Sequence, residues 1–321
     1  MSKKRISIIT PCFNEEQGVM ICYETIKKIF DSELKDYELE HIFCDNASTD
    51  RTVELLREAA TQDRRVKIIV NSRNFGILKN TYNGVLNSTG DAILLFMPVD
   101  LQDPPELIPE FVRHWEAGYE IVYGIRDKRQ ESFLSAVARK AYYRLLRQLT
   151  YVDYPLDVGD FQLIDKCVLN AMKQIDDAQP FMRLMTFDTG FKSIGIKYTW
   201  RTRKYGKSRN RIRDMFEQGL NGITSFSGAP LRMALILGFI IAGISLLYSV
   251  AIFLLTFFGF VRSQAGIPTV IIALFFFGGV QLFFLGVLGE YIYAIYNQVR
   301  RKPLVIERER VNFDVGSVKE E

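Results

Sequence analysis

The spacing of apolar residues divides the chain into two parts. Over the first two-thirds, short apolar runs alternate with amphipathic stretches, which is typical of strands followed by helices. Further along, residues 233–261 and residues 263–289 each lack a charged side chain. Both runs exceed the roughly 20 apolar residues that cross a hydrocarbon core about 30 Å thick. The pattern therefore predicts an α/β domain followed by two transmembrane helices.

Four strands and three helices are predicted in the first part. The run at residues 91–97 is apolar enough to be a central strand. Strands that alternate with helices at this spacing imply right-handed crossovers and a mostly parallel, Rossmann-like sheet with helices on both faces. The predicted strands cover residues 6–9, 38–44, 66–70 and 91–97, and the predicted helices cover residues 15–30, 48–59 and 80–87, with Ser48 and Thr49 as caps of the second helix.

The two long apolar runs are joined by a short turn around Arg262, so they form an antiparallel hairpin. Arginines and lysines flank the outer ends of the hairpin, whereas the turn carries a single charge. The positive-inside rule then places the α/β domain and both termini in the cytoplasm. The expected order is an α/β domain at residues 1–210, a linking helix at 211–229, two spans at about 233–260 and 267–292 within residues 230–298, and a cytoplasmic tail at 299–321.

The linking stretch at residues 211–229 has its apolar side chains on one helical face. Basic residues precede this stretch and a predicted span follows it. Two interpretations remain open, an interfacial helix that lies flat on the bilayer and a helix that packs on the α/β domain.

Composition narrows the classes of site and partner. With only two histidines, a histidine-based metal site is not expected, and four dispersed cysteines indicate reduced thiols rather than a disulfide framework. The net charge of +4 is modest, and much of the basic excess lies beside the predicted spans. This distribution favours contact with a lipid bilayer and excludes nucleic acid as the expected partner.

Polar residues follow each of the four predicted strands. One such group is an ordinary helix cap, but four at the carboxyl edge of one sheet predict a ligand crevice. A polar, acidic crevice of this kind suits a base, a ribose and a diphosphate. Carboxylates cannot hold the diphosphate directly, so a hard cation that prefers oxygen ligands, Mg²⁺ or Mn²⁺, is expected there. The four groups cover residues 11–16, 45–50, 71–76 and 98–105.

These groups resemble the motifs of the family 2 glycosyltransferases, which have the GT-A fold. Pro11–Glu15 resembles a Pro-x-Tyr-Asn-Glu opening, Asp45–Asp50 an Asp-Asp-Gly-Ser-Thr-Asp segment, and Asn71–Gly76 an Asn-x-Gly turn. Asp100–Glu106 resembles the end of an Asp-x-Asp-Leu-Gln-Asp-Pro-Pro-Glu signature. The resemblance extends from residue 6 to about residue 303. More narrowly, the chain resembles the polyprenyl-phosphate glycosyltransferases, the group that includes dolichol-phosphate mannose synthase and bacterial enzymes that act on undecaprenyl phosphate.

This resemblance implies a nucleotide-sugar donor, a polyprenyl-phosphate acceptor, a divalent cation, a bacterial inner-membrane location and a homo-oligomer. Asp45 would hold a uracil or ribose, and Asp100 with Gln102 would hold the metal. Arg203 and Arg209 lie in a segment similar to a basic loop that closes over the donor diphosphate. The residues expected to bind the nucleotide-sugar are Pro11, Phe13, Asn14, Glu15, Asp45, Asn74, Gly76, Val99, Asp100, Gln102, Arg203 and Arg209.

The acceptor half of the site is expected after the fourth strand. The segment Asp157–Leu163 resembles the Gly-Asp-Phe-Arg-Leu segment of the family's acid–base region. A lipid phosphate is already ionised at neutral pH, so a carboxylate there would mainly orient the attacking oxygen. Asp160 is the first choice for this role and Asp157 the second, with a turn cap as the alternative for either. Arg126 and Arg139 are assigned to the acceptor phosphate.

Pro98 stands where the family has the first aspartate of the Asp-x-Asp motif, and Asn46 stands where it often has a second acidic residue. Weaker metal binding, a different donor nucleotide and loss of activity are all consistent with these departures. The expected reaction is an inverting transfer, with UDP-glucose as the first donor to consider, that makes a lipid-linked sugar for modification of cell-envelope glycans. Alternatives are a nucleotide-binding membrane scaffold, a polysaccharide synthase and, least supported, a transporter subunit.

Overall fold

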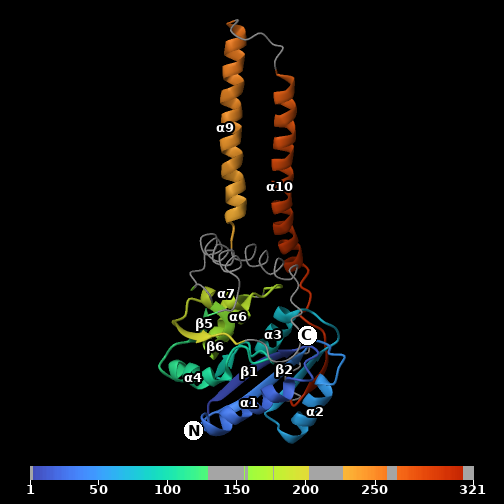
Figure 1. Ribbon diagram of the computed structural model, residues 1–321, viewed down its shortest axis with the longest axis vertical. Helices are drawn as coiled ribbons and strands as arrows, with labels where there is room; N and C mark the ends of the chain where they lie inside the picture. Colours follow the sequence, from blue (N-terminus) through green and yellow to red (C-terminus); the bar gives the residue numbers. More distant parts are fainter. Residues whose placement is uncertain are drawn as a thin grey trace. The chain divides into compact units, whose positions relative to one another are not determined.

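The computed structural model describes residues 3–128, 155, 158–175, 177–201, 227–258 and 266–313 (Figure 1). The described residues fall into two compact units. The described residues up to 201, together with residues 301–313, belong to the first unit, and the described residues from 227 to 300 belong to the second.

The first unit is built on an eight-stranded sheet in the order β7-β5-β6-β4-β1-β2-β3-β8. Strands β4, β1, β2 and β3 run parallel, β6 pairs antiparallel with both β4 and β5, and β7 is parallel to β5. The prediction of a parallel sheet is therefore confirmed for the first four strands, whereas the half that follows is mixed. The strands are β1 (Arg5–Cys12), β2 (Glu38–Asp45), β3 (Val66–Asn71), β4 (Ala92–Leu94), β5 (Ile121–Lys128), β6 (Val158–Asp165), β7 (Ser193–Thr199) and β8 (Glu307–Val311).

Helices cover both faces of this sheet, as Figure 1 shows. Side chains alternate along each strand, so that Ile8 and Phe43 face the core under α1, α2 and α4. On the other face α3 packs closely, because a Cβ at Gly84 would lie 2.9 Å from Ile9 Cγ2 and would overlap Cys44 Sγ. The helices of this unit are α1 (Val19–Ser32), α2 (Thr52–Gln62), α3 (Ile77–Leu86), the 3₁₀ turn η1 (Pro105–Leu107), α4 (Ile108–Glu116), α6 (Lys166–Ile175) and α7 (Met182–Asp188).

Strand β8 was not predicted. Its residues were assigned to a cytoplasmic tail, yet they pair antiparallel with β3 at the edge of the sheet. The strand Glu307–Val311 is highly charged and therefore lacks the apolar alternation that identifies strands in sequence. Ion pairs hold it instead, among them one between Arg57 and Glu309.

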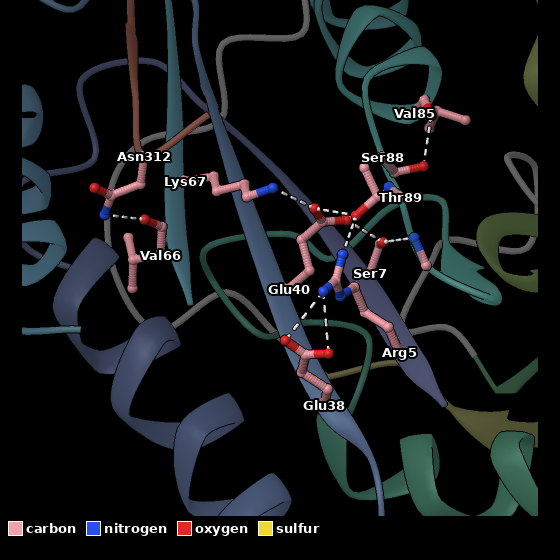
Figure 2. Close-up of polar contacts among 11 residues, drawn as sticks. Arg5, Ser7, Glu38, Glu40, Val66, Lys67, Val85, Ser88, Thr89 and Asn312 are labelled. Carbon is pink, nitrogen blue, oxygen red and sulfur yellow. Dashed lines mark hydrogen bonds and ion pairs between the residues drawn. The ribbon is translucent and has the colours of Figure 1, made fainter. Parts of the chain in front are cut away.

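The amino ends of the central strands are held together by a buried carboxylate, Glu40 (Figure 2). Lys67 Nζ donates to Glu40 Oε1 at 2.7 Å, and Thr89 donates to the same carboxylate from both its backbone nitrogen and its hydroxyl group, each at 2.8 Å. The Ser7 hydroxyl donates to Glu40 Oε2 and accepts from Gly90 N at 2.9 Å. The cluster therefore ties β1, β2 and β3 to the loop that leads into β4.

The second unit consists of α9 (Ala229–Phe257) and α10 (Ile267–Val299). Within them, Leu231–Ile252 and Phe276–Val299 are long and apolar enough to cross a membrane. The most apolar stretch of each segment is not buried by the rest of the chain. An exposed apolar surface of this size is typical of a membrane contact. Both helices overlap the predicted spans at about 233–260 and 267–292.

Candidate active site

Three strand ends meet at the carboxyl edge of the sheet. Cys12 at the end of β1 pairs with Asp45 at the end of β2, and Asp45 pairs in turn with Val70 of β3. The polar groups that follow these strands therefore begin at the same level, as the sequence predicted. Asn46 N also donates to Cys12 O at 3.0 Å, so the chain stays paired for one residue beyond β2.

The loops after β1 and β2 are joined by side-chain hydrogen bonds. Asn14, at a φ of 54°, accepts from Thr49 N at 2.7 Å, and its own backbone nitrogen donates to Ser48 Oγ at 2.8 Å. Glu15 N donates to Thr52 Oγ1 at 2.8 Å. Ser48 and Thr49 therefore bridge two loops and do not cap α2, whose N-cap residue is Arg51. The prediction that they cap this helix was wrong.

Asp45 is completely buried at the centre of these loops. Its carboxylate accepts from Ser48 N at 2.9 Å and from the Ser48 hydroxyl group, which supports the turn at Ala47, where φ is 65°. Burial raises the pKa of the Asp45 carboxyl, and the hydrogen bonds from Ser48 act in the opposite direction. The structure thus gives Asp45 a supporting role, and its contact with a base or ribose remains a prediction.

Asn46 uses both ends of its side-chain amide. Its Oδ1 accepts from Phe75 N at 2.9 Å and from Asn71 Nδ2 at 3.2 Å, while its Nδ2 donates to Asn74 Oδ1 at 2.9 Å. Asn74 Oδ1 also accepts from Gly76 N at 2.9 Å. An aspartate would lack the donor that this network needs. Asn46 therefore holds the loop after β3, a role that its position in a motif did not reveal.

The segment after β4 forms a turn around Asp100. Leu101 N donates to Pro98 O at 3.0 Å, Leu101 has a φ of 54°, and Gln102 N donates to Asp100 Oδ1 at 3.2 Å. Val99 is buried, and a Cβ at Gly18 would lie 3.1 Å from Val99 Cγ1, so the start of α1 closes over this turn. Pro98 takes part in the turn through its backbone carbonyl oxygen. This contact does not depend on the side chain at position 98.

Gln102 connects this turn to the end of β7. Its Nε2 donates to Arg201 O at 3.2 Å, and Arg201 N donates to Gln102 O at 3.0 Å. The Asp100 turn is therefore fastened to the segment that follows β7, the edge strand of the sheet.

A buried ion pair follows the Asp100 turn. Arg126 of β5 donates from Nη2 to both carboxylate oxygens of Asp103, at 3.2 and 3.1 Å, and from Nε to Tyr198 Oη at 3.0 Å. The Tyr198 hydroxyl donates to Asp103 as well. The guanidinium lies 5.2 Å from the ring centre of Trp200. Arg126 was predicted to bind the acceptor phosphate, and the structure shows that it already has a carboxylate partner.

Asp160 of β6 pairs with Arg183 in the first turn of α7. Arg183 donates to Asp160 from Nη2 at 2.7 Å and from Nε at 3.3 Å. Burial opposes the negative charge, but Arg183 and, more weakly, Arg126 outweigh burial and lower the pKa of the Asp160 carboxyl. Asp160 is therefore ionised at neutral pH and shares its charge with an arginine that the sequence analysis did not single out.

Several predicted residues lie outside the described residues. They are Asp157, Arg139, Arg203 and Arg209, together with most of the linking helix at residues 211–229. Of the predicted donor residues that are described, Pro11, Phe13, Asn14, Glu15, Asp45, Asn74, Gly76, Val99, Asp100 and Gln102 all lie on the loops at the carboxyl edge or on the strand ends that lead into them.

The described residues at this edge of the sheet can hold a divalent cation only if a substrate supplies further oxygen ligands. Among the described residues, no three Asp, Glu, His or Cys side chains gather as a metal cluster. Asp103 is paired with Arg126 and Tyr198, and Asp100 is the other carboxylate of this segment. Mg²⁺ is commonly held by one or two carboxylates and by substrate phosphates rather than by an all-protein cage. One carboxylate at Asp100 is compatible with that arrangement.

Comparisons with known proteins identify the family of the chain. The profile of the family described as "Glycosyl transferase family 2" matches residues 7–172. The glycosyltransferase YkcC of Bacillus subtilis is 38% identical over 301 residues, which cover 94% of this chain and 92% of that protein. The bactoprenol glucosyl transferase of Shigella phage SfX is 33% identical over 307 residues, which cover 95% of this chain and 99% of that protein.

Among solved structures, glucosyl-3-phosphoglycerate synthase from Mycobacterium tuberculosis, in complex with Mn²⁺, uridine diphosphate and phosphoglyceric acid, is 21% identical with a TM-score of 0.47. The match covers 69% of this chain and 76% of that one. The length and identity of the sequence matches decide the assignment. The chain belongs to glycosyl transferase family 2, and its first unit is a GT-A-like mixed sheet with flanking helices. It is a glycosyltransferase.

Proposed function

We propose that this enzyme transfers a sugar from a nucleotide-sugar to a polyprenyl phosphate at the surface of a bilayer. The observation that carries the proposal is the match to the bactoprenol glucosyl transferase of phage SfX, because it extends over 95% of the chain and so includes residues of both apolar helices. A soluble acceptor would not require two such helices, whereas an acceptor with a long apolar tail is confined to a membrane.

The donor occupies the loops at the carboxyl edge of β1 to β4 in this proposal. Asn14, Asn74 and Gly76 lie on loops that the network of Asn46 and Ser48 fixes in place. Fixed loops favour binding, because the entropy of ordering them is not lost when the donor arrives. UDP-glucose is the first donor to test, and modification of a cell-envelope glycan is the expected use of the product.

Mg²⁺ or Mn²⁺, when bound with the donor, would neutralise charge on the diphosphate. Asp100, with Gln102 beside it, is the residue of the described chain that would hold this cation. Arg203 and Arg209 remain the proposed cations that close over the same diphosphate. Positive charge fixed around a leaving group stabilises the charge that develops there in the transition state.

The acceptor half is proposed at Asp160, Arg183 and Arg126. The lipid phosphate is an anion, so arginines rather than a carboxylate would contact it. Asp160 holds the Arg183 guanidinium in a two-point contact and would thereby set its direction. Asp157 and Arg139 stay in the proposal as the second carboxylate and the second phosphate ligand.

The reaction is a single displacement. A phosphate oxygen of the acceptor forms a bond to the anomeric carbon, and the bond from that carbon to the diphosphate oxygen breaks. The electron pair leaves with the nucleoside diphosphate, so the anomeric configuration is inverted. No proton has to be removed from an ionised phosphate, which is why Asp160 can remain paired with Arg183 throughout.

The helices α9 and α10 cross the bacterial inner membrane in this proposal, with the first unit and both termini in the cytoplasm. Two spans give a small membrane footprint, and we propose that the enzyme assembles as a homo-oligomer.

The test is transfer of radiolabelled sugar from a panel of UDP- and GDP-sugars to undecaprenyl phosphate, in detergent, with and without Mg²⁺ or Mn²⁺. Label in the lipid phase from one donor, dependent on the cation, is the expected result and would name the sugar. Nucleotide binding without transfer from any donor would refute the proposal and favour a membrane scaffold.

A further inference from the structure

Most large apolar side chains in the described part of the first unit are buried, and the exceptions are unevenly placed. Four are exposed, namely Ile21, Ile77, Ile175 and Ile306. Ile77 begins α3, Ile175 ends α6, and Ile306 immediately precedes β8. Ile21 lies on α1, which covers the opposite face of the sheet. Three of the four exposed isoleucines therefore belong to elements on one side of the unit.

Hydrogen bonds link α3 to α6 and to the start of β8. The Tyr82 hydroxyl of α3 donates to Met172 O of α6 at 3.1 Å. Ser72 N donates to Ile306 O at 2.9 Å, and Asn83 Nδ2 of α3 donates to Glu307 Oε1 at 2.6 Å. Helix α3 is thus a neighbour of both α6 and the segment that leads into β8.

Three cations share this side of the unit. Arg73 and Lys302 are exposed, and Lys79 is half-buried one helical turn before Asn83, on the same face of α3. Burial lowers the pKa of Lys79, and repulsion from Arg73 and Lys302 lowers it further. Asp177 acts in the opposite direction, although its carboxylate also accepts from Gln179 N at 2.8 Å. Arg73 and Lys302 therefore each repel Lys79, on a side of the unit that also exposes isoleucine.

We propose that Ile77, Ile175 and Ile306, with Arg73, Lys79 and Lys302, form a surface that contacts the headgroups of an anionic bilayer. We call these six residues the headgroup surface. Exposed apolar side chains fringed by lysine and arginine are the pattern of interfacial membrane contacts, in which the apolar groups enter the headgroup boundary and the cations meet lipid phosphates. Gathered cations that repel one another in water are stabilised by such anions.

The length of α10 is consistent with a bilayer as the partner of the headgroup surface. This argument rests on the proposal above that α10 crosses the bilayer. Its 33 residues extend about 50 Å, slightly more than the 40–45 Å of a bilayer with its headgroups. Tyr291, Tyr293 and Tyr296 mark an aromatic belt in its last turns. Lys302 follows Val299 by three residues, a reach of about 10 Å, which is comparable to the Debye length of about 8 Å at physiological ionic strength.

This contact would also place the donor loop. Asn74 and Gly76 lie between Ser72, which is bonded to Ile306, and Ile77 of the headgroup surface. A headgroup contact at Ile77 and Ile306 therefore holds the rim of the donor site at the level of the lipid phosphates. The phosphate of a lipid acceptor lies at that same level.

The experiment uses the full chain in vesicles whose lipids carry bromine on the acyl chains, which quench nearby tryptophan. Ile306→Trp is compared with Ile21→Trp as the matched control, each corrected for the parent signal of Trp115 and Trp200. In vesicles that contain phosphatidylglycerol we expect quenching of the added Trp at position 306 about twofold or more above that at position 21. Adding Lys79→Gln and Lys302→Glu to the Ile306→Trp chain should remove most of this excess.

Equal quenching in Ile306→Trp and Ile21→Trp overturns the proposal, as does equal quenching of Ile306→Trp in phosphatidylglycerol and in pure phosphatidylcholine vesicles. The parent protein is tested in parallel for sugar transfer and for retention in the vesicles after an alkaline wash. Release by the wash would refute membrane crossing and the headgroup surface together. A retained, active protein without the quenching difference would refute the headgroup surface alone.

Discussion

Asn46 donates a hydrogen bond from its side-chain amide to the side-chain oxygen of Asn74 at 2.9 Å, across the ends of β2 and β3. The same amide accepts from Phe75 N at 2.9 Å. Asn46 is buried, so each of these bonds replaces one to water. Loss of a partner from a buried group costs about 1–3 kcal/mol. The Asn46 side chain is therefore a main support of the loop after β3, where we propose that the donor binds.

Asn46→Asp is predicted to weaken donor binding, because it replaces the amide donor with an oxygen that faces another oxygen on Asn74. We expect the KM for the nucleotide-sugar to rise about tenfold with a smaller change in kcat. Steady-state transfer rates and calorimetry of nucleotide binding measure the two effects. Asn87→Asp at the end of α3 is the matched control, and an equal loss in both variants would contradict a specific role for Asn46.

Asp100→Ala is predicted to abolish the response to Mg²⁺ and to lower transfer by on the order of 10²-fold, since a fixed charge at the diphosphate is lost. Gln102→Ala should have a weaker effect, because the Gln102 side chain is also used to bind Arg201 O. Initial rates across a Mg²⁺ titration make the comparison. Glu106→Gln is the control, since this exposed carboxylate pairs with Arg201 and should leave the titration unchanged.

Asp160 and Arg183 are predicted to act as one unit on the acceptor. Asp160→Asn and Arg183→Ala should each raise the KM for the polyprenyl phosphate about tenfold and leave the donor KM near its original value. The double variant should be little worse than either single variant, because residues in one ion pair are not additive. Additive losses, or a pH–rate profile that follows Asp160 at its ordinary aspartate pKa, would show that the carboxylate acts independently of Arg183.

The four strand ends were predictable because a short, largely apolar run is followed in each case by a group of polar residues. The expectation that their polar groups gather followed from the rule that parallel strands end at one edge. The contacts of Asp103 and Asp160 were not predictable. Asp103 is bonded to Tyr198, which lies 95 residues away, and Asp160 is bonded to Arg183, which lies 23 residues away. Nothing in local sequence reports such pairings.

Asn46 illustrates the limit of motif comparison. Its substitution for an acidic residue was interpreted as a loss of charge in the crevice, whereas the structure shows an amide whose donor and acceptor are both used. Pro98 is similar, because its carbonyl oxygen closes the Asp100 turn. Backbone and amide hydrogen bonds of this kind depend on the fold and cannot be identified from residue type alone.

Glu40→Gln is predicted to lower the free energy of unfolding by about 3 kcal/mol, because it leaves the largely buried Lys67 without its anion. Burial raises the pKa of the Glu40 carboxyl, but hydrogen bonds from Lys67, Ser7 and Thr89 outweigh burial and the pKa is lowered. Glu40 therefore stabilises the fold above its unfolded pKa of about 4.3, and this contribution is lost as the pH falls through the lower folded value.

Thermal unfolding of the parent and the Glu40→Gln variant, followed from pH 7 down through pH 3, measures this linkage. The gap between them should be widest near neutral pH and should narrow only in the acid range. Glu38→Gln is the control on the same strand, since its exposed pair with Arg5 is expected to contribute less than about 1 kcal/mol (Figure 2). A gap that stays constant across the range would contradict an ionised Glu40.

A chain that ends at Pro303 is predicted to lose both stability and donor affinity, although it keeps all of the predicted site residues. Without β8, Ser72 N loses its acceptor Ile306 O, Asn83 loses Glu307, and the edge of β3 is left unpaired. The loop from Ser72 to Gly76 then keeps its hydrogen bonds with Asn46, whereas its bond to Ile306 is lost. We expect a lower thermal midpoint and a donor KM raised several-fold, about the effect of one or two lost hydrogen bonds.

A chain that ends at Phe313 keeps every contact described for β8 and is the matched control. If the chain ending at Pro303 loses stability but keeps the donor KM of this control, β8 only completes the sheet. Asn83→Ala distinguishes the two roles without removing the strand, because it breaks the link between α3 and Glu307 and leaves the backbone pairing of β8 intact. A raised donor KM in Asn83→Ala, with the thermal midpoint nearly unchanged, would therefore establish that the C-terminal strand positions the donor loop.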